Sequence, residues 1–299
     1  MKTGFIGIVG RPNVGKSTLM NAILGEKIAI ATDKSQTTRN TIRGIYTREA
    51  AGEDGGCQMV FIDTPGIHRP KNKLGSYMTD IAVNTLREVD VILFLVDDVA
   101  GGLAAGDKEI LELLSQSHTK KVLAINKMDK LDPEAFRLAY ETYERTGLFD
   151  AIVGTNAEKG HNVDTLLRIL EDLLVEGPMY FPADMVTDRA ERFLAGEIIR
   201  EKVLMYLSDE VPHGVAVEIE LFDEKPDITN INAVIYCEKK SHKGILIGRD
   251  GKKLKGIGKS ARLEIEALLG TKIYLELWVK VRENWRDNPQ ALRSLGYRT

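Results

Sequence analysis

The feature that most constrains the fold of this 299-residue chain is a glycine-rich turn near its amino terminus. The turn, GRPNVGKS, fits the pattern G-x-x-x-x-G-K-[ST] and stands between an apolar run, Thr3–Val9, and an amphipathic stretch, Lys16–Leu24. A strand–turn–helix of this kind closes backbone N–H groups around a phosphate at the positive end of the helix dipole. We expect Lys16 to contact the β- and γ-phosphates and the Ser17 hydroxyl to bind Mg²⁺. The residues expected around the phosphates are Gly10, Arg11, Pro12, Asn13, Val14, Gly15, Lys16, Ser17 and Thr18.

Short apolar runs alternate with amphipathic stretches through the first 175 residues. Apolar strands separated by helices indicate a mostly parallel sheet that is covered on both faces, so we predict a doubly wound α/β domain over residues 1–175. The further predicted strands are Met59–Asp63, Val91–Asp97, Lys121–Asn126 and Ala151–Gly154. The further predicted helices are Tyr77–Glu88, Asp107–Ser117, Pro133–Arg145 and Val163–Leu174.

The order of elements changes after Glu176-Gly177-Pro178, and we predict a linker over residues 176–187. The remaining residues, 188–299, have the pattern of a smaller α+β domain with a short helical tail. Its predicted helices are Arg189–Leu207, Lys243–Ile247, Lys253–Leu269 and Pro289–Leu295. Its predicted strands are Val215–Phe222, Ile231–Cys237 and Lys272–Val281.

Charge is unevenly distributed along the chain, whose formal net charge is −3. Residues 239–299 carry 15 Lys/Arg and 6 Asp/Glu, whereas residues 1–238 carry 26 and 38. A basic end on an acidic body suggests a polyanionic partner, and a solvated surface explains the same charge equally well. No apolar run reaches the ~20 residues of a membrane span, and the start lacks a signal-peptide pattern, so we expect a cytoplasmic protein. Its two cysteines, Cys57 and Cys237, are expected to be reduced thiols.

A second motif, Asp63-Thr64-Pro65-Gly66, ends the predicted strand Met59–Asp63. A carboxylate at this place can hold Mg²⁺ through water, and the N–H of Gly66 can reach the γ-phosphate. The tetrapeptide is weak evidence alone, but it follows a phosphate loop and ends a later strand. The predicted nucleotide contacts here are Asp63, Thr64, Pro65, Gly66 and the next residue, Ile67.

A third motif, Asn126-Lys127-Met128-Asp129, begins at the last residue of the predicted strand Lys121–Asn126. The Asp129 carboxylate can accept hydrogen bonds from N1–H and the 2-amino group of guanine, and adenine offers neither arrangement. A site built for two such donors rejects a base that lacks them. The motif therefore favours GTP over ATP.

The three motifs together resemble those of the Era-like branch of the translation-factor class of GTPases. Gln36-Thr37-Thr38-Arg39 resembles the switch I segment of that branch, which implies that a threonine contacts Mg²⁺. We favour Thr38, with Thr37 as the alternative. The resemblance also places a guanine-contacting loop at Asn156-Ala157, where the serine usual in that loop is replaced by Asn156.

The residue after Gly66 is Ile67, where many GTPases carry a water-orienting glutamine. Isoleucine has no hydrogen-bonding group, and the neighbouring His68 is a weak catalytic candidate. Hydrolysis is therefore expected to depend on charge stabilisation and positioning by Lys16, Asp63 and Thr38. Asn13 resembles an asparagine that is associated with a K⁺ ion in hydrophobic-substituted relatives. We expect slow turnover without K⁺ or RNA.

In the second domain, a G-x-x-G loop, Gly248–Gly251, lies between two predicted helices. The order of elements resembles a type II KH domain, whose loop lets the backbone of single-stranded RNA pass closely. Trp278 and Trp285 could stack bases, although packing is the favoured role for Trp278. The predicted RNA-binding residues are Lys243, Gly248, Arg249, Asp250, Gly251, Lys252, Lys253 and Lys255.

A GTPase domain followed by one KH domain resembles, over essentially the whole chain, a family of bacterial ribosome-assembly GTPases. The resemblance implies binding to the 3′ end of small-subunit rRNA, action on the small ribosomal subunit, and peripheral association with the inner face of the cell membrane. The alternative is an RNA-binding module whose nucleotide domain senses GTP and hydrolyses it negligibly. Ile67 keeps this alternative open.

Overall fold

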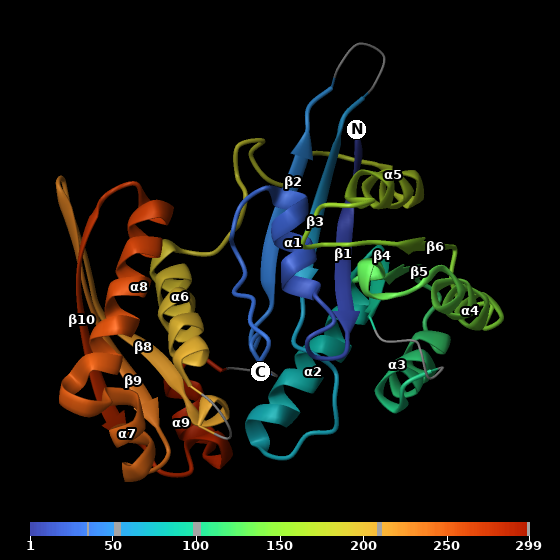
Figure 1. Cartoon of the computed structure of the whole chain (residues 1–299). Coiled ribbons are helices and arrows are strands. Elements are labelled where there is room, and N and C mark those ends of the chain that lie inside the picture. Colours follow the sequence, from blue (N-terminus) through green and yellow to red (C-terminus); the bar gives the residue numbers. More distant parts are fainter. Residues whose placement is uncertain (35, 51–54, 98–102, 208–210, 298–299) are drawn as a thin grey trace. The chain divides into compact units, whose positions relative to one another are not determined.

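The computed structural model describes residues 1–34, 36–50, 55–97, 103–207 and 211–297 (Figure 1). The chain divides into two compact units. The first comprises residues 1–31, 38–69 and 78–188, and the second comprises residues 32–37, 70–77 and 189–299.

The first unit is built on a seven-stranded sheet with the order β2-β3-β1-β4-β5-β6, to which β7 is added beside β1. β2 and β7 run antiparallel to their neighbours, and the other pairings are parallel. The strands are β1 (Lys2–Gly10), β2 (Ile42–Arg48), β3 (Cys57–Asp63), β4 (Val91–Val96), β5 (Lys120–Ile125), β6 (Ala151–Gly154) and β7 (Val175–Glu176).

Helices cover both faces of this sheet. The central strands β3 and β4 are therefore buried along their whole length. α2, α3 and α4 share one core with alternate side chains of the strands, and α1 packs beside α5. These helices are α1 (Lys16–Leu24), α2 (Lys73–Glu88), α3 (Ala105–Ser115), α4 (Pro133–Glu144) and α5 (Val163–Leu173). The prediction of a doubly wound, mostly parallel α/β fold is confirmed.

The segment after β7 is bound to the first unit, although its composition is that of a linker. Gln58 on β3 is fully buried, and its Oε1 accepts hydrogen bonds from the N–H groups of Tyr180 (2.8 Å) and Phe181 (3.0 Å). Further along, the N–H of Ile45 donates to the carbonyl of Val186 at 2.8 Å. Residues 176–187 therefore extend along the sheet instead of standing free.

The second unit packs helices against a three-stranded sheet with the order β10-β9-β8. β8 (Ala216–Lys225) is antiparallel to β9 (Ile228–Cys237), and β10 (Lys272–Val281) is parallel to it. The inward side chains of these strands form one apolar core with α6 and α8. The helices are α6 (Glu191–Tyr206), α7 (Lys240–Ile247), α8 (Lys252–Leu269) and α9 (Pro289–Ser294). The predicted smaller α+β domain has this order of elements.

Among the described residues, no helix combines the length and the apolar character needed to span a membrane.

Candidate functional site

The phosphate loop connects the end of β1 to the start of α1. The ammonium of Lys16 is buried and donates to the carbonyls of Gly10 (3.1 Å) and Arg11 (2.9 Å). Gly15 has φ 101°, and a Cβ there would collide with the side-chain amide of Asn126. The close approach of Asn126 and the left-handed backbone both require glycine at this position.

Ser17, Thr38 and Asp63 meet beside this loop. Asp63 Oδ2 accepts hydrogen bonds from the hydroxyls of Ser17 (2.6 Å) and Thr38 (3.3 Å), and the two hydroxyl oxygens are 2.9 Å apart. Asp63 Oδ1 is buried and has no hydrogen-bond partner among the described residues. Hydroxyl and carboxylate oxygens are the ligands that Mg²⁺ prefers, so these residues fit that ion. Thr37, the alternative, instead donates its hydroxyl to the carbonyl of Lys34 at 2.6 Å.

Burial changes the ionisation of both charged groups in this site. It lowers the pKa of the Lys16 ammonium to about 8, although Asp63 opposes the effect. It raises the pKa of the Asp63 carboxyl, although Lys16 and the hydrogen bond from Ser17 oppose this. Burial therefore removes part of the hydration of each charge. A bound phosphate would compensate Lys16 for this loss, and a bound divalent cation would compensate Asp63.

We expect GDP binding to take up protons at alkaline pH. Phosphate oxygens favour the charged form of Lys16, so its pKa rises from about 8 when the nucleotide binds. Affinity should fall as pH rises above about 8, because the free protein then loses the proton that the complex retains. Titration calorimetry in two buffers of different ionisation enthalpy, at about pH 8.5, measures this uptake. The uptake should vanish in Lys16→Ala, and equal uptake in that variant would assign it to another group.

The segment after β3 lies against the phosphate loop. The Thr64 hydroxyl donates to the carbonyl of Ile8 at 2.7 Å, and a Cβ on Gly66 would lie 2.6 Å from the backbone nitrogen of Pro12. The N–H of Ile67 donates to the Gly10 carbonyl at 3.2 Å. The Ile67 side chain is buried in the apolar core, so it cannot position water.

Asn126 joins the phosphate loop to the two loops that follow β5 and β6. Its Nδ2 donates to the carbonyl of Val14 at 2.9 Å. Its Oδ1 accepts from the N–H of Ala157 (3.0 Å) and from the hydroxyl of Thr155 (3.2 Å). The backbone N–H of Ala157, in the loop expected to contact guanine, is thus engaged with Asn126 in this structure. Asn156 is buried, and its Nδ2 has no hydrogen-bond partner among the described residues.

The Asp129 carboxylate, the expected acceptor for guanine, lies at the surface of the protein. Its side chain is 36% exposed and forms an ion pair with Lys159 at 3.1 Å. The hydrogen bond from Lys159 lowers the pKa of Asp129, so the carboxylate stays ionised as an acceptor. Lys127 donates to the carbonyl of Asn13 at 2.7 Å, and the Met128 N–H donates to the carbonyl of Thr155 at 3.1 Å.

The G-x-x-G loop of the second unit connects α7 to α8. The side chains of Arg249 and Asp250 are 95% and 72% exposed, and Asp250 has φ 54°. Three nearby lysines, Lys243, Lys252 and Lys255, are exposed, whereas Lys253 is half-buried. The loop thus presents cations and accessible backbone where a phosphodiester chain could pass.

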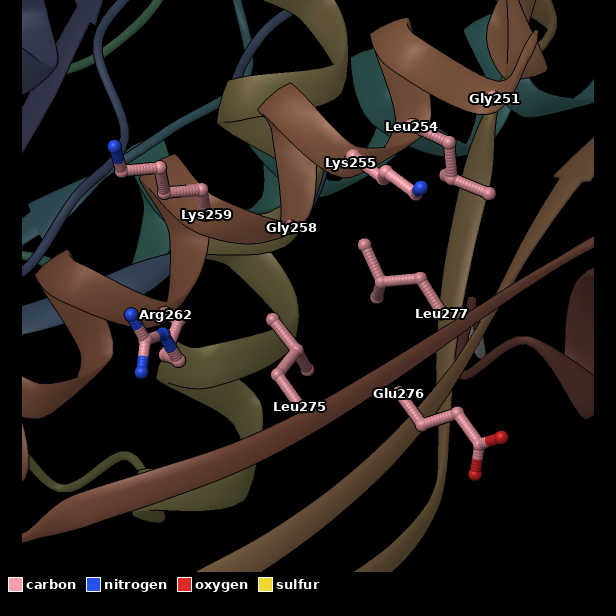
Figure 2. A pocket seen from close by; sticks show the side chains of 9 residues that line it. All are labelled: Gly251, Leu254, Lys255, Gly258, Lys259, Arg262, Leu275, Glu276 and Leu277. Carbon is pink, nitrogen blue, oxygen red and sulfur yellow. The ribbon is translucent and has the colours of Figure 1, made fainter.

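A groove of about 440 Å³ begins at this loop and runs between α8 and β10. Figure 2 shows Leu275 and Leu277 extending from β10 toward α8, whereas Glu276 points away from the helix. Apolar side chains form the floor of the groove, and cations lie along its helical side. Its lining residues are Gly251, Leu254, Lys255, Gly258, Lys259, Arg262, Leu275, Glu276 and Leu277.

The sequence motif predicts the Gly248–Gly251 loop but not most of the residues that line the groove. Leu275 and Leu277 carry the only available signal, an alternation of apolar residues along β10, which also describes an ordinary core strand. Trp278 follows Leu277 on the strand and is 56% exposed. Trp285 is fully buried, and its Nε1–H donates to the carbonyl of Gly214 at 2.9 Å. Trp285 therefore packs in the fold and does not stack bases.

The fold and these two sites define a class of protein: a phosphate-loop GTPase with a carboxyl-terminal KH domain. Residues 5–127 match the family described as 50S ribosome-binding GTPase, and residues 210–286 match the KH domain family. The chain is 55% identical over 298 residues to the GTPase Era of Alkaliphilus metalliredigens, with 99% of each chain covered. It is also 55% identical over 300 residues to the GTPase Era of Clostridioides difficile, covering 99% of this chain and 98% of the relative. This chain belongs to the Era family of GTPases.

Two solved structures of Era resemble the whole chain. One is Era in complex with MgGDPNP and nucleotides 1506–1542 of 16S ribosomal RNA, and the other is an Era variant from Aquifex aeolicus bound to GDP·AlF4⁻. Each has a TM-score of 0.94 and 40% sequence identity, and each match covers 100% of both chains.

Proposed function

We propose that this protein binds and hydrolyses GTP with Mg²⁺ held at Ser17, Thr38 and, through water, Asp63. The observation that carries this proposal is that the hydroxyls of Ser17 and Thr38 meet at Asp63 Oδ2, while the buried Oδ1 of the same carboxylate has no hydrogen-bond partner among the described residues. Bound Mg²⁺ would neutralise charge on the β- and γ-phosphate oxygens. The Lys16 ammonium would bind the same phosphates, and Asp129 would accept hydrogen bonds from guanine. The complex of a relative with MgGDPNP supports this arrangement.

The second part of the proposal is that the KH domain binds single-stranded RNA near the 3′ end of small-subunit rRNA, in assembly of the small ribosomal subunit. Exposed cations at the Gly248–Gly251 loop suit the phosphates, and the apolar groove suits unstacked bases. The complex of a relative with a 16S rRNA segment supports the choice of RNA. We also propose a cytoplasmic protein that associates peripherally with the inner face of the cell membrane, on the family resemblance alone.

Fluorescence anisotropy with a labelled 3′-terminal rRNA fragment tests the RNA proposal. The fragment should bind more tightly than a scrambled oligonucleotide of the same length at every salt concentration. Equal binding of the two oligonucleotides would show only the electrostatic attraction of the protein for any RNA, and it would contradict the proposed preference for this rRNA.

A GTP sensor with negligible hydrolysis is the second candidate, and the burial of Ile67 favours it. We infer instead that charge stabilisation by Lys16, Mg²⁺ and a K⁺ ion near Asn13 supports slow turnover, which RNA increases. Asn13 lies in the phosphate loop with φ 67°, and its carbonyl accepts a hydrogen bond from Lys127.

Phosphate release under multiple turnover should separate the two candidates. Lys16→Ala and Asp63→Ala should each lower kcat by about 100-fold or more, as loss of transition-state charge stabilisation does elsewhere. Ile67→Ala should lower kcat by less than about tenfold, and a thermal melt checks that this core substitution leaves the fold intact. Turnover should be higher in K⁺ than in Na⁺. Equal rates in the two salts would remove K⁺ from the account, and no release with K⁺ and RNA would establish the sensor.

A further inference from the structure

Arg11 in the phosphate loop carries a guanidinium that the nucleotide contacts described above do not use. Its Nε donates to Asp107 Oδ1 at 2.8 Å, and one terminal nitrogen pairs with Asp97 Oδ1 at 3.2 Å. The Asp107 side chain has no exposed surface, and the Arg11 side chain is 24% exposed. A planar guanidinium can serve two carboxylates at once, whereas an ammonium is a single point charge.

Strand order explains why these residues meet. Asp97 directly follows β4, which lies between β1 and β5 in the sheet. The phosphate loop follows β1 and the guanine loop follows β5, so Asp97 stands between them. Its Oδ1 faces Arg11 of the first loop, and its Oδ2 pairs with Lys127 of the second loop at 2.7 Å.

Asp107 is the second carboxylate that binds the Arg11 guanidinium. It lies in the first turn of α3, where a carboxylate is favoured by the helix dipole. The Tyr143 hydroxyl on α4 donates to Asp107 Oδ2 at 3.4 Å. The Arg11 side chain also lies over Gly106, since a Cβ there would be 2.8 Å from Arg11 Cδ. α3 thereby holds the Arg11 side chain directly, and α4 supports it through Asp107.

The backbone of Arg11 takes part in the phosphate site, because its carbonyl accepts the hydrogen bond from Lys16. We propose that Arg11, Asp97 and Asp107 form a positioning network that holds the phosphate loop in register with the guanine loop and thereby slows nucleotide release. This proposal rests on the GTP binding proposed above. None of the three side chains needs to touch the nucleotide for the network to act.

The test is the dissociation rate of a fluorescent GDP analogue, followed by stopped flow after an excess of GDP is added. Asp107→Asn and Arg11→Gln should each speed release on the order of tenfold, the range seen when coupling residues are altered. Gly106→Ala keeps every charge and should speed release in the same direction by displacing Arg11. Arg137→Gln on α4, which removes an exposed ion pair with Glu141, is the matched control and should leave release unchanged.

A double-mutant cycle separates positioning from general destabilisation. If both substitutions act through one network, Arg11→Gln with Asp107→Asn should release GDP no faster than Arg11→Gln alone. Additive effects, or unchanged release in Asp107→Asn and Gly106→Ala, would overturn the proposal. Arg11→Lys retains the charge and one donor, so it keeps the test available if Arg11→Gln fails to fold. Failure of the parent protein to bind the analogue would instead refute the GTP-binding proposal.

Discussion

Asp129→Asn is expected to weaken GTP binding by about 100-fold or more and to strengthen binding of xanthosine triphosphate. In the proposed complex the carboxylate would accept from two guanine donors, whereas the amide would place its own N–H opposite the 2-amino group. Loss of a hydrogen bond to a charged group costs about 1.5–3 kcal/mol, and an unpaired donor in the complex costs a further 1–3 kcal/mol. Xanthine has an oxygen at position 2, which can accept from the new amide. Competition against a fluorescent GDP analogue measures both affinities.

The ion pair between Asp129 and Lys159 provides the control for this substitution. Lys159→Gln removes the cation and leaves the acceptor in place, and an exposed pair of this kind contributes little. GTP affinity in Lys159→Gln should therefore stay within a few-fold of the parent value. If Asp129→Asn binds GTP as tightly as the parent, Asp129 does not read the base.

Reversing two charges at the RNA loop is expected to have the second large effect. Arg249→Asp with Lys252→Asp places two carboxylates where a phosphodiester backbone must approach Gly248–Gly251. RNA affinity should fall at least about tenfold near physiological salt, and the slope of log K against log[salt] should become shallower by about 0.7 for each phosphate that the variant no longer neutralises. GDP affinity should hardly change, because the nucleotide site lies in the other compact unit.

A double substitution with the same change in net charge controls for non-specific electrostatics. Lys225 is exposed at the end of β8, and Arg293 is exposed on α9. Lys225→Asp with Arg293→Asp should retain most of the RNA affinity. If both doubly substituted proteins bind RNA equally well at several salt concentrations, the cations of the loop are only a solvated surface.

Elements with strong local signals could be predicted from the sequence. The helix Lys16–Leu24 and the strands Ala151–Gly154 and Lys272–Val281 have the predicted bounds, since apolar periodicity and a glycine-rich turn mark them. The strand Ile42–Arg48 was missed because it combines a glycine with three polar residues, Arg43, Thr47 and Arg48, which is a composition common in loops. It exists because β3 offers it an antiparallel edge, which is a tertiary effect.

The nucleotide motifs could be read locally because each directly follows a strand, and parallel strands bring their carboxyl ends to one edge. Hydrogen bonds and ion pairs between residues of distant elements could not be predicted from the sequence. Arg11 and Asp107 are 96 positions apart, and the Gln58 hydrogen bonds that hold the 176–187 segment span more than 120 positions. The floor of the RNA groove likewise depends on β10 lying beside α8, which no spacing within one segment predicts.

Crosslinking the purified protein to total cellular RNA, followed by sequencing of the bound fragments, tests the central claim most directly. The claim is that one chain joins a GTPase site to an RNA site for small-subunit rRNA. Fragments from the 3′ end of that rRNA should be enriched with the parent protein and should disappear with the Arg249→Asp, Lys252→Asp variant. Equal recovery from all abundant RNAs, or enrichment that survives in the variant, would contradict the account.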